Sequence, residues 1–257
     1  MSVRLPAVVL AAPGTNRDGD VAGALEAVGA ATRVVALAEL RDDPKLLDPS
    51  RLVVVAGGFS FADALGSGRL FALELADILG EGVAALLAAG RPVLGICNGF
   101  QTLVRLGLLP GDSRQAVLAP NSSGRFECRW VTLAADPSSR CVWTRDLPEP
   151  ITCPVAHGEG RFSAPDATLA AIEAGGQVAL RYAGDSSAAA GGEYPANPNG
   201  SVADIAGICD ATGLVLGLMP HPENHIHEWQ HPRWRRGDRR GNALTLFERG
   251  VRYAEAT

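Results

Sequence analysis

Residues 93–101 read Val93-Leu94-Gly95-Ile96-Cys97-Asn98-Gly99-Phe100-Gln101. The apolar run before Cys97 predicts a buried strand, and the stretch from Phe100 to Leu108 predicts a helix directly after it. A cysteine between two glycines at this junction is the pattern of a nucleophile elbow with Cys in place of Ser. The turn is tight, and the helix N-terminus favours a thiolate. The alternative is a buried structural cysteine, a common place for free cysteines.

The chain before the elbow alternates between Val-rich runs and apolar residues at helical spacing. Val-rich runs predict buried parallel strands, and the helical spacing predicts helices between them. The predicted strands are Val3–Leu10, Thr32–Leu37, Arg51–Ala56 and Arg91–Ile96, and the predicted helices are Asp20–Val28, Leu70–Leu79 and Val83–Ala89. This order is typical of an α/β fold with an open, mostly parallel sheet and flanking helices.

The chain after the elbow has a different pattern. Gly124–Leu133 alternates between Phe126, Cys128 and Trp130 on one side and Glu127, Arg129 and Val131 on the other, which predicts a half-exposed antiparallel strand. Ser186–Gly200 is rich in Ala, Gly, Pro and Asn, which predicts a mobile surface loop. Further predicted strands are Cys141–Trp143, Ile151–Ala156 and Val215–Met219, and further predicted helices are Asp166–Ala174 and Asn242–Tyr253. Because no repeat or linker interrupts residues 1–257, we expect a single domain.

Composition narrows the class of protein. The 257 residues are 47% hydrophobic and carry a net charge of −5, which argues against a nucleic-acid binder. The five cysteines have irregular spacings without a Cys-x-x-Cys pair, which argues against a zinc ribbon or a disulfide scaffold and favours a reducing compartment. The first apolar run is too short to span a bilayer and lacks a cleavage site. We therefore expect a cytoplasmic protein without a membrane partner.

His221-Pro222-Glu223 follows the last predicted strand, at the strand end where open α/β sheets place their sites. A thiolate needs a base, and Glu223 is close enough in sequence to fold back and orient the imidazole of His221. A surface His-Pro turn is one alternative. A zinc site is another, since a run of possible ligands contains His221, Glu223, His225, His227 and His231. The sequence lacks the His-Glu-x-x-His pattern, and the predicted site contains no metal.

Gly57-Gly58-Phe59-Ser60 follows another predicted strand. Glycines at a strand end allow backbone N–H groups to approach an oxyanion closely, although a Gly-Gly pair here is often only a turn. The elbow, the His-Pro-Glu segment and this turn therefore lie at the ends of separate parallel strands, which one crevice can join.

These motifs resemble the triad (class I) glutamine amidotransferases and, more narrowly, the glutaminase subunits of phosphoribosylformylglycinamidine synthases. The resemblance covers most of the chain. Its elbow and His-Pro-Glu motifs are common to the wider family, whereas residues 154–162 and 201–207 indicate the narrower group. The matching stretches are Gly57–Ser60, Pro92–Leu103, Asn121–Arg129, Pro154–Phe162, Ser201–Gly207 and Gly217–Glu223.

The resemblance implies a function and a role for each site residue. Cys97 would be the nucleophile, His221 the base and acid, and Glu223 the residue that orients His221. The oxyanion would be held by backbone N–H groups near Gly58 and of Asn98, and Gln101 and Phe59 would lie near the bound glutamine. Gly57 belongs to the same predicted substrate-binding turn. His157 and Glu159 receive no role beyond shaping the pocket or a partner interface.

The resemblance also implies partners. An ATP-dependent synthetase subunit, with ATP and Mg²⁺ on that partner, would use the ammonia in purine biosynthesis, and a small third subunit would assist. This chain has no phosphate-binding loop and needs no cofactor of its own. Two other classes remain open, a stand-alone Cys hydrolase such as a γ-glutamyl peptidase and a non-enzymatic regulatory subunit.

Two segments depart from the family pattern. The turn after Ser60 is usually Tyr-Gly-Asp in the family, whereas this chain has Phe61-Ala62-Asp63, and Leu65–Gly68 also differs from the usual run. The segment Asn224–Gly241 is longer than expected and contains several arginines between 233 and 240. These arginines predict a solvated loop or, alternatively, a surface that docks an acidic partner or a phosphate.

Overall fold

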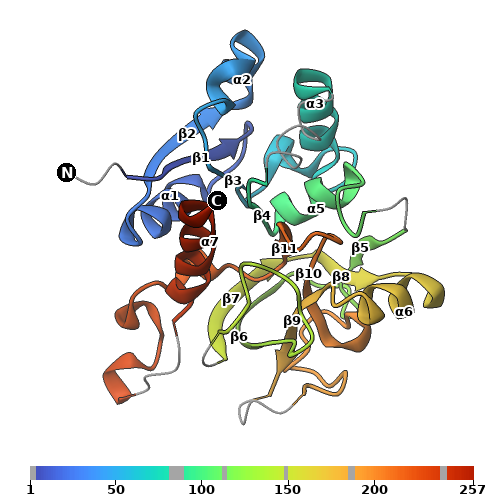
Figure 1. Ribbon diagram of the computed structural model, residues 1–257. Helices are drawn as coiled ribbons and strands as arrows, with labels where there is room; N and C mark the ends of the chain where they lie inside the picture. The colour runs from blue at the N-terminus through green and yellow to red at the C-terminus, as the bar shows by residue number, and fades with distance from the viewer. Residues whose placement is uncertain (1–3, 81–89, 112–114, 148–149, 185–188, 238–241) are drawn as a thin grey trace.

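One large sheet organises the computed structural model, which describes residues 4–80, 90–111, 115–147, 150–184, 189–237 and 242–257 (Figure 1). In these residues the sheet has nine strands, in the spatial order β2 (Ala31–Ala36), β1 (Pro6–Ala11), β3 (Leu52–Val55), β4 (Val93–Ile96), β11 (Val215–Leu218), β10 (Ile205–Cys209), β9 (Val178–Ala183), β6 (Glu127–Ala135) and β7 (Ile151–His157). From β2 to β11 neighbouring strands are parallel, and from β11 to β7 they are antiparallel. The predicted combination of a parallel sheet with antiparallel strands in the second half is confirmed.

Helices cover both faces of the parallel part (Figure 1). On one face α1 (Asp18–Ala27) packs beside the C-terminal helix α7 (Leu244–Ala256). On the other face α3 (Arg69–Leu79) packs between α2 (Leu37–Asp42) and α5 (Asn98–Arg105). Right-handed crossovers explain this distribution. The chain moves toward one edge of the sheet from β1 to β2 and toward the other edge from β2 to β3 and β4, so the crossover helices lie on opposite faces.

Smaller elements complete the described chain. A two-stranded antiparallel sheet pairs β5 (Val117–Pro120) with β8 (Glu159–Ser163), and α6 spans Asp166–Ala174. Short 3₁₀ turns are η1 (Pro44–Leu47), η2 (Ser60–Asp63), η3 (Val202–Asp204), η4 (Pro222–Asn224), η5 (Glu228–Gln230) and η6 (Trp234–Arg236). No helix in the described ranges is long and apolar enough to cross a membrane.

Apolar runs buried on both faces account for the central strands. All residues of β3, β4 and β11 are buried, as expected for parallel strands covered by helices on both sides. These three strands are neighbours in the sheet, so the residues that follow them meet at one edge. Gly57, Cys97 and His221 lie just beyond these carboxyl ends, which confirms that the predicted motifs converge.

Several sequence-based predictions need correction. Cys141–Trp143 is a buried turn instead of a strand. Trp143 packs closely against Gly250 of α7 and donates from Nε1 to the carbonyl oxygen of Leu214 at 3.2 Å, so core packing explains the apolar residues. Strands β5, β8, β9 and β10 were not among the predicted elements. The predicted helix at 83–89 lies outside the described residues, as does Val3.

The predicted surface loop at Ser186–Gly200 is wrong at Asn197 and Asn199, which are buried. Asn197 donates to Asp204, and Asn199 donates to the carbonyl oxygen of Gly160, each through its Nδ2 atom. These amides fix the backbone of the segment to the core, and residues 185–188 lie outside the description. In β6 the buried face carries Glu127 and Val131, whereas Cys128 and Phe126, which directly precedes the strand, are exposed.

Candidate functional site

Cys97 occupies the turn between β4 and α5 with φ 51° and ψ −106°, a backbone conformation that non-glycine residues rarely adopt. Close packing forces the turn. A Cβ on Gly99 would lie 2.0 Å from the carbonyl oxygen of Val55, and one on Gly95 would lie 2.5 Å from Cδ1 of Leu103. A larger residue would therefore clash at either flanking position, which agrees with the tight turn predicted from the sequence.

His221 lies beside Cys97 and is held by Glu223. Nδ1 of His221 is 2.6 Å from Oε1 of Glu223, and both side chains are buried. The short 3₁₀ turn η4, which starts at Pro222, folds Glu223 back beneath the imidazole. This arrangement leaves Nε2 of His221 as the ring nitrogen for proton transfer with Cys97.

The electrostatics of the site favour the protonated imidazole. Burial disfavours a charge on His221, but the negative charges of Glu223 and Cys97 and the hydrogen bonds to both outweigh it and raise the pKa of His221 to about 10. The imidazole of His221 is therefore protonated at neutral pH. Sγ of Cys97 also lies 4.0 Å from the carbonyl oxygen of Ala156.

Gly57 lies between the nucleophile and the base. A Cβ there would be 3.0 Å from Cε1 of His221 and 3.3 Å from Cβ of Cys97, so a side chain would crowd both residues. Gly58 has φ +138° and packs against the backbone N of Asn16. The turn therefore brings its backbone close to Cys97, as an oxyanion site requires. The backbone N–H of Asn98, at the start of α5, is also without an acceptor inside its helix.

Asn98 ties the elbow to the turn after β3. The hydroxyl of Ser60 donates to Oδ1 of Asn98, and Nδ2 of Asn98 donates to Oδ1 of Asp63 at 3.1 Å and to Oε1 of Gln101 at 3.1 Å. The side chain of Asn98 is buried. The side chain of Asn98 therefore fixes the neighbouring loop to the first turn of α5.

A cavity of about 330 Å³ opens beside Cys97. Gly58, Phe59 and Gln101, three predicted substrate-binding residues, line it together with Cys97. Phe59 stacks on Phe126 with 6.2 Å between ring centroids, and both rings are exposed at 44% and 52%. The size suits a small polar molecule, and the two rings form an apolar rim.

Asn121 has a role at the site that the sequence pattern does not reveal. Nδ2 of Asn121 donates to the carbonyl oxygens of Arg125 at 2.9 Å and His157 at 2.7 Å, so its Oδ1 faces Nδ1 of His157 at 3.0 Å. Burial and the charge of His221 lower the pKa of His157 to about 3, which keeps this ring neutral. Asn121 lies in a stretch that carries the family resemblance, but its role depends on a contact between distant segments.

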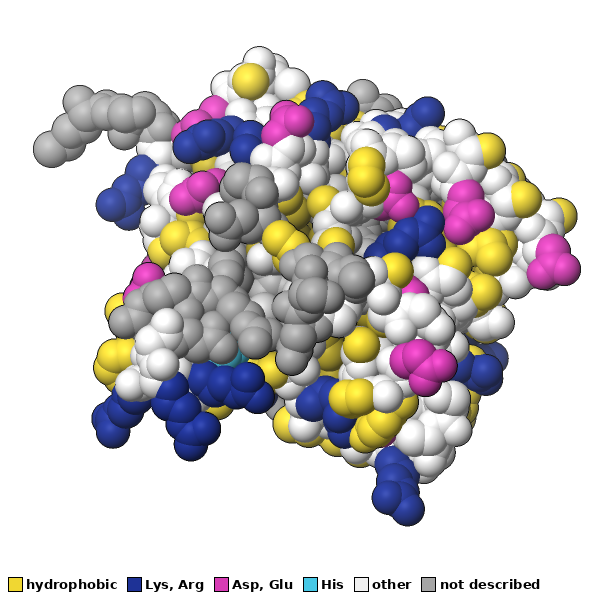
Figure 2. Space-filling view, turned by 90° about the horizontal axis from the view of Figure 1, so that it is seen from below, with side chains coloured by type: hydrophobic (Ala, Val, Ile, Leu, Met, Phe, Trp, Pro, Cys, Tyr) yellow, Lys and Arg dark blue, Asp and Glu magenta, His cyan; other side chains and the backbone are white. Residues whose placement is uncertain are grey.

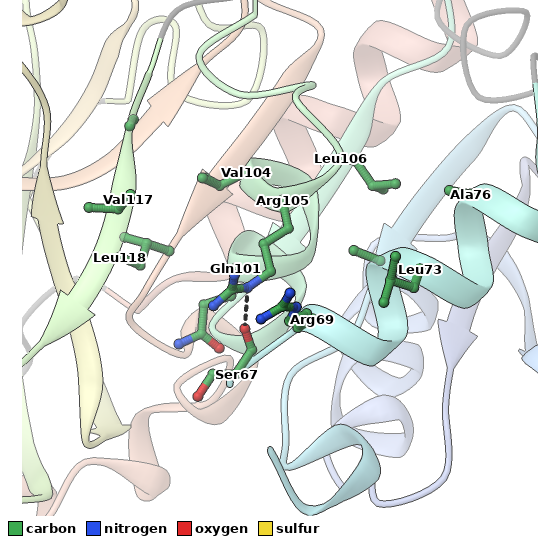
Figure 3. A pocket seen from close by; sticks show the side chains of 12 residues that line it. Ser67, Arg69, Leu73, Ala76, Gln101, Val104, Arg105, Leu106, Val117 and Leu118 are labelled. Atoms are coloured by element: carbon green, nitrogen blue, oxygen red, sulfur yellow. Dashed lines mark hydrogen bonds between the residues drawn. The ribbon is translucent and has the colours of Figure 1, made fainter. Parts of the chain in front are cut away.

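Asp63 and Ser67 were also not predicted. Both line the cavity with Glu159, whose backbone carbonyl oxygen accepts from Nε2 of Gln101 at 2.5 Å. A second groove of about 620 Å³ adjoins the cavity and shares Ser67 and Gln101 with it. Figure 3 shows this groove between α3, α5 and β5, with Nε of Arg105 donating to the carbonyl oxygen of Ser67 at 2.8 Å.

The three histidines after Glu223 lie in two different environments. His225 and His231 pack edge-on against Trp130, whereas His227 stacks on Trp229. Within the described part of the chain, no group of three or more His, Cys, Asp or Glu residues is arranged to hold a metal ion. Of the arginines between residues 233 and 240, the structure describes Arg233, Arg235 and Arg236, and all three are exposed. Figure 2 shows Lys and Arg side chains gathered along the lower left edge of the molecule.

Comparison with known proteins gives a consistent result. Residues 4–254 match the family described as the CobB/CobQ-like glutamine amidotransferase domain. The phosphoribosylformylglycinamidine synthase subunit PurQ of Treponema denticola is 47% identical over 96% of this chain and 98% of its own length. The same subunit of Dehalococcoides mccartyi is 38% identical, with 98% of each chain covered.

A solved structure agrees with these relatives. The structure of PurLQS from Thermotoga maritima contains a chain with a TM-score of 0.76 and 32% identity, covering 98% of this chain and 99% of that one. Fold, sequence and length therefore all correspond over nearly the whole chain. The chain belongs to the CobB/CobQ-like glutamine amidotransferase domain family and, within it, to the family of PurQ subunits.

Proposed function

We propose that this chain is the glutaminase subunit of a phosphoribosylformylglycinamidine synthase, which hydrolyses glutamine and supplies ammonia to a synthetase partner. The observation that carries the proposal is the convergence of Cys97, His221 and Gly57 at the ends of neighbouring strands, with Glu223 hydrogen-bonded to His221 at 2.6 Å. The family description supports glutamine as the substrate, and the names of the PurQ relatives and of the PurLQS structure support the synthase assembly.

Each residue then has a chemical task. His221 takes the thiol proton, and the Cys97 sulfur attacks the side-chain carbonyl carbon of glutamine. Backbone N–H groups near Gly58 and of Asn98 hold the resulting oxyanion. His221 returns its proton to the leaving ammonia, which leaves a glutamyl thioester on Cys97. Water that loses a proton to His221 hydrolyses the thioester to glutamate and restores the thiol.

The neighbouring groups explain why this chemistry suits the site. The raised pKa of His221 keeps the imidazolium available as the acid that protonates ammonia. Gly57 leaves room for the ring to stay close to Cys97. The strained backbone of Cys97 exposes the sulfur to the cavity at the start of a helix, where the dipole favours negative charge.

The proposal extends to cofactors, domain and compartment. No step needs a metal or an organic cofactor on this chain, and ATP with Mg²⁺ belongs to the synthetase. The chain acts as a single domain in the cytoplasm, with the synthetase and a small third subunit as partners. The single domain is supported by the main sheet, in which β1 and β11, from opposite ends of the chain, are both members.

Cys97→Ser tests the proposal. In the complex with its synthetase, this variant should lose at least about 1000-fold of glutamine-dependent synthesis but retain synthesis driven by added ammonia. Cys128→Ser is the matched control, since Cys128 is exposed and lies outside the cavity. Substantial glutamate formation by Cys97→Ser would show that another group is the nucleophile. Peptide cleavage in place of ammonia release would favour a stand-alone hydrolase.

A further inference from the structure

Two carboxylates line the cavity beside Cys97. Asp63 comes from the turn after β3, and Glu159 comes from the start of β8. The hydroxyl of Ser67 lies between them, donating to Oε2 of Glu159 at 3.2 Å and interacting also with Asp63. A hydroxyl has one proton, so it can donate to only one of these carboxylates at a time. The pair therefore retains acceptor capacity that faces the cavity.

The positive charge near this pair is distant and screened. Nη2 of Arg105 is 3.9 Å from Oε1 of Glu159, and the two side chains are 37% and 30% exposed. An ion pair of this length and exposure neutralises little of the charge. Burial, and after it the charge of Glu159, raises the pKa of Asp63 against the hydrogen bonds from Ser67 and Asn98. The wall of the cavity is thus suited to a positively charged group.

His157, which lines the same cavity, has a buried ring nitrogen without a hydrogen-bond partner among the described residues. Because Oδ1 of Asn121 must accept from Nδ1 of His157, the proton of this neutral ring is on Nδ1 and the lone pair is on Nε2. Nε2 is buried and has no hydrogen-bond partner among the described residues, and His157 lines the cavity with Asp63 and Glu159. An unpaired buried acceptor is costly, so this ring nitrogen adds to the acceptor groups around the cavity.

We propose that Asp63 and Glu159 bind the α-ammonium group of the substrate glutamine and so select the free amino acid. This inference rests on the proposed glutaminase function. An ammonium group has three N–H donors and a positive charge, which match two carboxylates that share one hydroxyl proton. The cavity of about 330 Å³ is near the lower limit for ligand pockets, which fits a single amino acid.

The two carboxylates are also tied to the helix that follows the reacting group. Both lie on the cavity wall that contains Gln101, whose Nε2 fixes the backbone of Glu159, while Asn98 fixes Asp63. Cys97 immediately precedes Asn98, so the ammonium subsite and the nucleophile are held by the same first turn of α5. A substrate anchored at its α-ammonium would therefore present its carboxamide at a fixed distance from Cys97.

The test compares glutamine with glutaramate, which is glutamine without its α-amino group. In the assembled complex, the wild-type chain should prefer glutamine over glutaramate by at least about 100-fold in kcat/KM. Asp63→Asn and, separately, Glu159→Gln should lower kcat/KM for glutamine about 10- to 100-fold, because each removes a charge-assisted hydrogen bond. The value for glutaramate should stay within about threefold, so the preference shrinks by the same factor.

Glu74→Gln is the control for loss of a negative charge. Glu74 is on α3, pairs with Arg41 at 3.5 Å and lies outside the cavity, so both substrates should be unaffected. A damaged fold would lower both substrates by the same factor, and that result in both cavity variants would overturn the inference. An unchanged preference in both variants would overturn it too. A wild-type complex that does not hydrolyse glutamine would instead refute the proposed function.

Discussion

Nδ1 of His221 lies 2.6 Å from Oε1 of Glu223, and the side chain of Glu223 is entirely buried. The residue between them is Pro222, which starts the short turn η4 and restricts the backbone where it folds back. A carboxylate in this position determines both the tautomer and the charge of the imidazole. Burial lowers the pKa of His221, and the charge of Glu223 is the leading influence that raises it.

The pH dependence of glutamine hydrolysis should reveal this dependence. With Glu223 present the pKa of His221 is raised to about 10, although burial alone would lower it. Glu223→Gln keeps the shape and removes the charge, so the pKa of His221 should fall. Because the imidazolium must protonate ammonia, the alkaline limb of kcat should move to lower pH. Measurement of kcat across pH values from about 6 to about 10 checks this shift.

His221→Ala serves as the reference for that experiment. It removes the base itself and should lower kcat more than Glu223→Gln does, since orienting residues usually cost less than the groups they orient. An alkaline limb in Glu223→Gln that coincides with that of the wild type would show that Glu223 does not control the charge of His221.

The elbow should be intolerant of a single added methyl group. A Cβ on Gly99 would lie 2.0 Å from the carbonyl oxygen of Val55, a backbone atom that cannot rotate away. Gly99→Ala should therefore destabilise the chain by about 3 kcal/mol. Gly23→Ala is the same chemical change within α1, where nothing lies within 4 Å of the new methyl, and should stabilise by about 0.5–1 kcal/mol. Urea unfolding of both variants measures the difference, and equal stabilities would contradict the proposed packing.

The turn after β3 contains a position, Ala62, at which a substitution should stabilise the chain. Ala62 has φ 54° and is exposed, at a position where the family pattern has Gly. Ala62→Gly should relieve the left-handed strain and stabilise the chain by about 1 kcal/mol, raising Tm by about 2–4 °C. Ala64→Gly is the control, because Ala64 has φ −56° and an added glycine there only increases the entropy of the unfolded chain. A lower Tm for Ala62→Gly would show that the strain is absent.

Local sequence was sufficient to propose the triad because its members are recognisable from local geometry. Cys97 is recognisable from flanking glycines that pack against the preceding strand and helix, and His221 with Glu223 is recognisable from one short turn. Parallel strands such as β3 and β4 were predictable since they are buried on both faces and read as continuous apolar runs.

The remaining elements depend on contacts between distant segments. β9 pairs with both β10 and β6, and β10 contains a glycine and register shifts that obscure its pattern. Trp143 was misassigned because an apolar run buried against α7 reads like a strand. Asp63 and Glu159 are far apart in sequence, and only the folded chain shows that they share Ser67.

The glutaminase activity should depend on the synthetase. Free ammonia in water is largely protonated and no longer nucleophilic, so a site completed only on docking avoids its loss. Phe59 and Phe126 form an exposed apolar rim beside the catalytic cavity, and Phe59 precedes Ser60, which hydrogen-bonds to Asn98. A partner that covers this rim can thus act on the residue next to Cys97. The isolated chain should form glutamate at least about tenfold more slowly than the chain with synthetase, ATP and formylglycinamide ribonucleotide.

A variant of the apolar rim formed by Phe59 and Phe126 tests where the synthetase acts to stimulate glutamine hydrolysis. Phe59→Ala should reduce the stimulation by the partner while the slow activity of the isolated chain changes less, because the ring contributes to the rim and leaves Cys97 and His221 in place. Leu73→Ala is the comparison, since Leu73 is an exposed apolar residue of α3 that lines the neighbouring groove. Measurements of glutamate formation by both variants, with and without the partner, show whether the stimulation acts through the rim or through the groove. Stimulation lost only in Leu73→Ala would place the coupling in the groove, and equally high rates with and without the partner would show that the site is complete in the isolated chain.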